Sequence, residues 1–147
     1  IHKVAADIAE KLVIIGFSAG NASCMEELTR LSKEDRLAAY VCVSFGTRAT
    51  ALSDPDPTAS LRVLKDEMPH PPPASMMAAY EKMIAPSLFI IGDQDIITPV
   101  EDMQAVLDRM SRKCGPNHMG ELQVLKGKHG FENGDDADGP AVAIKEF

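Results

Sequence analysis

Apolar and polar positions along the chain predict strands that alternate with helices. Apolar runs at residues 12–15, 40–46 and 88–91 have the length of strands, and the run at 88–91 has the unbroken character of a strand buried on both faces. Apolar and polar residues alternate at 121–125, which is typical of a strand nearer an edge. We therefore expect an α/β domain with a mostly parallel sheet that is flanked by helices.

The first helix is expected from about residue 19 to residue 31. Its apolar residues Met25, Leu28 and Leu31 recur at helical spacing and are expected to face the sheet. Glu27 and Arg30 are expected to lie in solvent.

A second helix is expected after residue 98. Thr98, Pro99 and Glu101 have the order of a capping box with proline at the first helical position. The apolar stripe of this helix consists of Met103, Val106, Leu107 and Met110. A last helix is expected to begin near residue 141.

The sequence Gly16-Phe17-Ser18-Ala19-Gly20 joins the first predicted strand to the first predicted helix. A serine between a strand and a helix is typical of a nucleophile elbow, where glycines remove Cβ atoms from crowded backbone and the helix directs free amides at the bound group. The alternative is a glycine-rich loop that carries a surface serine. The order of the elements favours the elbow, with Ser18 as an activated alcohol and the amide of Ala19 as an oxyanion donor.

A serine nucleophile needs a base that takes its proton and a carboxylate that orients the base. Asp95 lies between the buried strand at 88–91 and the capped second helix, which favours it as the carboxylate over a solvated turn aspartate. Asp93 is the runner-up for this role.

The base is expected to be His129, which follows the strand at 121–125 between Gly127 and Gly130. The remaining histidines do not follow a predicted strand; they are His2, His70 and His118. The sequence thus predicts a triad of Ser18, Asp95 and His129 at one edge of the sheet.

The chain resembles the carboxyl-terminal half of an α/β-hydrolase of the dienelactone-hydrolase-like kind. Residues 16–20 are similar to the elbow of that family, residues 92–95 to its acid turn and residues 127–131 to its histidine loop. The resemblance implies that Ser18 is the nucleophile, Asp95 the acid and His129 the base. Related proteins without catalytic activity imply the alternative of a subunit that keeps only the fold.

A complete member of that family carries several strands before its elbow, whereas residues 1–17 precede Ser18 here. Those residues resemble the single helix before the elbow strand. The resemblance implies a single domain over residues 1–147 that is incomplete at its amino terminus, so that a missing segment or another chain completes the sheet. It also implies either a lid or a long surface loop at residues 53–86, where methionines suit a flexible apolar substrate.

Composition narrows the possible partners. The net charge of −7 disfavours a surface for nucleic acid, and no apolar run reaches the ~18 residues of a membrane span. Cys24, Cys42 and Cys114 lack metal-ligand spacing, and reduced thiols suggest a cytoplasmic protein without metal or cofactor.

Two functions remain in view. The first is a serine hydrolase that acts on a small acyl substrate, which is an ester, a thioester or an activated amide. The alternative is a non-catalytic α/β-hydrolase-like subunit that serves as a scaffold for protein interaction.

Overall fold

The computed structural model describes residues 11–45, 85–114, 120–131 and 137–147. The expected helix before the elbow strand lies outside these residues, as does the expected lid or loop except for its last two positions. Among the described residues, no helix combines the length and the apolar character that crossing a membrane requires.

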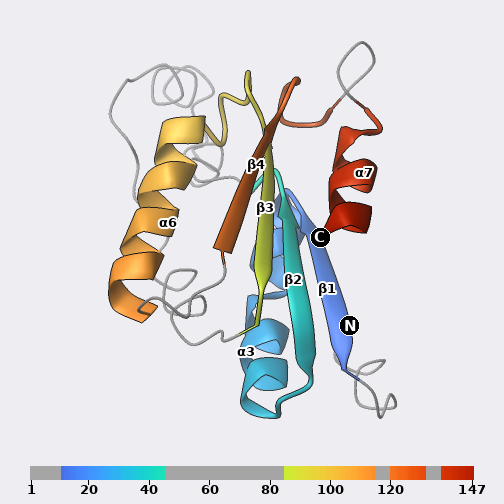
Figure 1. Cartoon of the computed structure of the whole chain (residues 1–147), viewed down its shortest axis with the longest axis vertical. Helices are drawn as coiled ribbons and strands as arrows, with labels where there is room; N and C mark the ends of the chain where they lie inside the picture. Colours follow the sequence, from blue (N-terminus) through green and yellow to red (C-terminus); the bar gives the residue numbers. More distant parts are fainter. Residues whose placement is uncertain (1–10, 46–84, 115–119, 132–136) are drawn as a thin grey trace, which may run out of the picture.

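Four parallel strands form the sheet of the described residues (Figure 1). They are β1 (Leu12–Phe17), β2 (Leu37–Val43), β3 (Ser87–Gly92) and β4 (Gly120–Leu125), in that order across the sheet. Because parallel neighbours need a crossover connection, all four carboxyl ends lie at the same edge. This arrangement confirms the expected α/β class with a parallel sheet.

Helices cover both faces of the sheet (Figure 1). One face packs against α2 (Ala19–Ser23), α3 (Met25–Lys33) and α6 (Val100–Cys114), and the opposite face packs against α7 (Gly139–Glu146). Strand β3 supplies both cores, since Phe89 and Ile91 join the first and Leu88 and Ile90 join the second. The expectation that this strand is buried on both faces is confirmed.

The helix expected at 19–31 is two helices, because the helix is interrupted at Cys24. At the interruption the Cys24 thiol donates a hydrogen bond to the carbonyl of Asn21 at 3.2 Å. The prediction that Glu27 lies in solvent was also wrong. Its carboxylate is buried against the Arg30 guanidinium, with contacts of 2.6 and 3.0 Å that satisfy both oxygens.

Strand β1 is buried on one face only, which corrects the expectation of a fully buried elbow strand. Ile14 packs in the first core, whereas Val13, Ile15 and Phe17 are between 51% and 56% exposed. These three side chains point to the face that α7 covers over β3 and β4. Within the described residues, β1 pairs with β2 and forms one edge of the sheet.

Candidate active site

Ser18 occupies a sharp turn between β1 and α2. Its φ angle is 47°, in the left-handed region that costs a residue with a Cβ roughly 1–2 kcal/mol. The Ser18 amide donates to the Val43 carbonyl at 3.0 Å, and the Ser18 carbonyl accepts from the Asn21 amide at 3.0 Å. These bonds hold the unusual backbone and place the side chain beyond the end of the sheet, as the sequence predicts for an elbow.

The two glycines of the elbow have different roles. A Cβ on Gly16 would lie 2.2 Å from Oδ1 of Asn21, so glycine is required there. A Cβ on Gly20 would meet nothing within 4 Å. The expectation that both glycines relieve crowding therefore applies to Gly16 alone.

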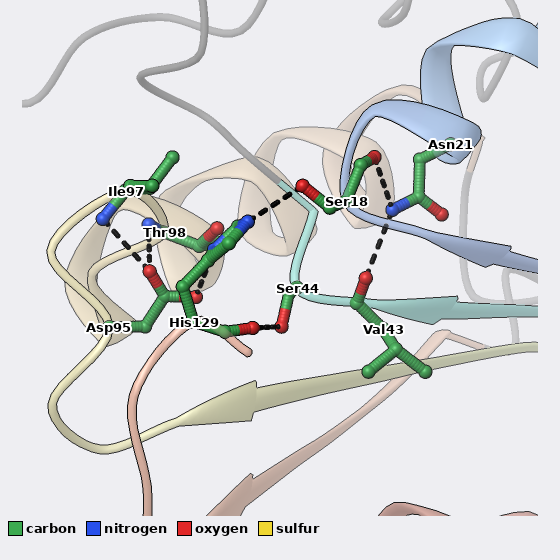
Figure 2. A network of polar contacts seen from close by, with 8 residues as sticks. All are labelled: Ser18, Asn21, Val43, Ser44, Asp95, Ile97, Thr98 and His129. Atoms are coloured by element: carbon green, nitrogen blue, oxygen red, sulfur yellow. Dashed lines mark hydrogen bonds and ion pairs between the residues drawn. The ribbon is translucent and has the colours of Figure 1, made fainter. Parts of the chain in front are cut away.

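The three expected triad residues lie in one hydrogen-bonded chain (Figure 2). Ser18 Oγ is 2.8 Å from Nε2 of His129, and Nδ1 of the same ring is 2.8 Å from Oδ2 of Asp95. A carboxylate only accepts hydrogen bonds, so the ring proton belongs on Nδ1 and leaves Nε2 to accept from the serine hydroxyl. This geometry suits removal of the hydroxyl proton.

Backbone amides fix the carboxylate of Asp95. Its Oδ1 accepts from the amides of Ile97 and Thr98, each at 2.8 Å, while Oδ2 faces the histidine. The Asp95 side chain has no exposed surface, whereas 19% of the His129 side chain is exposed. The acid is therefore locked in place, and the imidazole remains accessible.

Asp93, the runner-up for the acid, supports the histidine loop from outside. Its carboxylate accepts from the Gly127 amide at 3.0 Å, and its own amide donates to the Leu125 carbonyl at 2.8 Å. The Gln94 amide donates to the Gly127 carbonyl at 2.9 Å. These bonds join the turn after β3 to the loop that carries His129.

Sequence reasoning did not identify Ser44 and Asn21. Ser44 is buried with a φ of 51°, and its hydroxyl donates to the carbonyl of His129. A polar residue directly after β2 was the available signal, since that position lies at the edge that carries the triad. Asn21 is also buried, and its helical position gave no such signal.

The Ala19 amide is in the first turn of α2, where backbone N–H groups lack an acceptor within the helix. Cys24 lies nearby in the core, and burial raises the pKa of its thiol, so the neutral form is favoured. A neutral thiol is a weak nucleophile and does not compete with Ser18. The described part of the chain contains no cluster of three or more His, Cys, Asp or Glu that could hold a metal.

No protein-family model and no curated protein sequence matches the chain. Solved structures do match it. A monoacylglycerol lipase from Paleococcus ferrophilus is 19% identical with a TM-score of 0.62, and the match covers 99% of this chain and 70% of the lipase.

An esterase from Pyrococcus furiosus is also 19% identical, with a TM-score of 0.57 over 97% of this chain and 56% of the esterase. A serine hydrolase involved in carbazole degradation is 15% identical, with a TM-score of 0.54 over 98% of this chain and 67% of that enzyme. The chain thus corresponds to between about half and two thirds of the length of these enzymes. Its parallel sheet and flanking helices have the fold of the α/β-hydrolases.

Proposed function

We propose that this protein is a serine hydrolase that cleaves an ester, a thioester or an activated amide. The observation that carries the proposal is the continuous chain of contacts from Ser18 through His129 to Asp95, at 2.8 Å for each step. The three residues come from three separate loops, and their meeting at one edge of the sheet suits nucleophilic catalysis better than any structural role.

In the proposed reaction, Ser18 Oγ attacks the acyl carbon while Nε2 of His129 takes the hydroxyl proton. Asp95 stabilises the imidazolium that forms, and the Ala19 amide donates to the oxyanion of the tetrahedral intermediate. His129 then gives its proton to the leaving group as the bond to the acyl carbon breaks. A water molecule, deprotonated by the same nitrogen, releases the acid and restores Ser18.

Two similar structures are named as a lipase and an esterase, which supports a carboxylic ester as the first substrate class to examine. The dienelactone-hydrolase-like subgroup remains a prediction from the motifs at residues 16–20 and 127–131. The expected cytoplasmic location also remains a prediction.

A fluorophosphonate probe tests the proposal because it phosphonylates activated serines. We expect the full-length protein to be labelled at Ser18 and the Ser18→Ala variant to lose the label. Ser23→Ala is the matched control, since Ser23 is an exposed serine on the adjoining α2 and should not affect labelling. Equal labelling of wild type and Ser18→Ala would contradict the proposal.

One observation favours the alternative of a non-catalytic scaffold. Val13, Ile15 and Phe17 expose an apolar strip on the edge strand β1, and such a strip is typical of a surface that another polypeptide segment covers. A folded, full-length protein that no acyl-enzyme probe labels would favour the scaffold over the hydrolase.

A further inference from the structure

One buried side chain fastens the nucleophile elbow to the neighbouring strand (Figure 2). Asn21 is fully buried, and its Nδ2 donates to the carbonyls of Ser18 and Val43, each at 3.0 Å. Its Oδ1 accepts from the Tyr40 hydroxyl at 2.8 Å. Both donor hydrogens of the amide and its oxygen are therefore engaged.

The surroundings of Asn21 specify its position. Gly16 leaves the space that the amide oxygen fills, because a Cβ there would lie 2.2 Å from Oδ1. Tyr40 is fully buried in an edge-to-face contact with Phe89, with ring centroids 6.3 Å apart. The tyrosine ring is thus held by packing, and its hydroxyl sets the orientation of the asparagine amide.

The two carbonyls that Asn21 contacts belong to the peptide groups that define the elbow. The Val43 carbonyl also accepts from the Ser18 amide, and the Ser18 carbonyl also accepts from the Asn21 amide. A residue with a left-handed backbone, such as Ser18 at φ 47°, persists only where its surroundings over-determine it. The asparagine amide bridges both peptide groups and supplies that additional constraint.

We propose that Asn21, oriented by Tyr40, is a positioning residue for the nucleophile. It holds Ser18 in the left-handed conformation that directs Oγ at Nε2 of His129. The inference rests on the proposed hydrolase function, which it deepens by assigning the residues that set the geometry of the attacking oxygen.

Loss of the asparagine side chain is expected to affect catalysis more than folding. In Asn21→Ala the carbonyls of Ser18 and Val43 each keep a backbone N–H partner, so neither is left without a hydrogen bond. What the variant loses is the bridge between the two peptide groups. The elbow then samples other backbone conformations, in which Oγ is farther from His129.

The test compares Asn21→Ala, Tyr40→Phe and the double variant in the full-length polypeptide. The kcat for a small ester is measured per active site, with sites counted by fluorophosphonate titration. We expect kcat to fall about 100-fold in Asn21→Ala, since a misplacement of ~1 Å costs about that factor, with KM changed less than about threefold. Tyr40→Phe should lower kcat about 10-fold, and the double variant should be no slower than Asn21→Ala because the tyrosine acts through the asparagine.

Ser87→Ala is the matched control. Ser87 is fully buried and polar, but its hydroxyl bonds the Ala85 carbonyl at the amino end of β3, away from the triad. We expect the control to keep the wild-type kcat per titrated site. A merely structural role for Asn21 would lower the number of titrated sites and leave kcat per site unchanged, and that result would overturn the inference.

Crystal structures of wild type and Asn21→Ala separate this inference from the proposed function. If the wild-type protein is neither labelled nor active, the hydrolase proposal fails, and the structures alone decide the positioning role. Loss of the Ser18–His129 hydrogen bond in Asn21→Ala supports that role. Retention of the bond and of a positive φ at Ser18 overturns it.

Discussion

Replacement of Gly92 by alanine tests how the end of β3 positions the catalytic histidine. A Cβ at this position would lie 2.2 Å from the Gly127 carbonyl oxygen, 2.6 Å from the Gly127 carbonyl carbon and 2.8 Å from the Lys128 carbonyl oxygen. All three atoms are backbone, so no change of rotamer relieves the contact. The loop before His129 has to move instead.

The size of that movement follows from the contact distances. Ordinary van der Waals contact begins at 3.4 Å, so the Gly127 oxygen must retreat by about 1.2 Å. That oxygen also accepts the Gln94 amide, and the Ser18–His129 distance of 2.8 Å leaves no slack. A displacement of ~1 Å lowers kcat about 100-fold, which corresponds to ~2.7 kcal/mol in the activation barrier.

The assay is ester hydrolysis per fluorophosphonate-titrated site, with circular dichroism to check that Gly92→Ala is folded. Gly20→Ala is the matched control, because the same substitution there meets nothing within 4 Å and lies in α2. We expect the control to keep full activity and to gain up to ~1 kcal/mol of stability from the helix preference of alanine. A folded Gly92→Ala variant with wild-type kcat would refute this reasoning.

Four further outcomes are expected. Asp95→Asn should lower kcat by about 10⁴-fold, since the carboxylate that orients His129 is lost, and steady-state kinetics that show less than about a tenfold loss would argue against Asp95 as the acid. Ser44→Ala should lower kcat about 10-fold by freeing the His129 carbonyl, and unchanged kinetics would exclude that support. Phe89→Ala should reduce the free energy of unfolding in urea by ~3–5 kcal/mol, because the ring is fully buried between two aromatic neighbours, and a loss under ~1 kcal/mol would contradict its core position. Burial raises the pKa of the Cys24 thiol, so iodoacetamide should alkylate Cys24 only after unfolding, and rapid modification of the native protein, detected by mass spectrometry, would contradict its burial.

The parallel sheet and the helix stripe of α6 were predictable because their patterns are local. The run at 88–91 and the spacing of Met103, Val106, Leu107 and Met110 each reflect burial against a neighbouring layer. The burial of β1 was predicted less well. Its sequence is as apolar as a buried strand, but its exposure depends on which segments lie beside it, and Val13 and Ile15 carry no information on that.

The residues that bear the chemistry were predictable, whereas those that hold them in place were not. Ser18, Asp95 and His129 follow strands, so their common edge could be inferred from topology. Left-handed backbone was expected at glycines but occurs at Ser18, Ser44 and Phe131, because contacts from other segments fix these positions. The role of Asn21 likewise depends on a tyrosine from another strand, which local sequence does not reveal.

The crystal structure of the protein after reaction with a fluorophosphonate tests most directly whether Ser18 is the nucleophile. We expect continuous density from Ser18 Oγ to phosphorus, with a phosphonyl oxygen within hydrogen-bond distance of the Ala19 amide. An unmodified Ser18 in a folded full-length protein, or an adduct on a different residue, would contradict the proposed catalytic role.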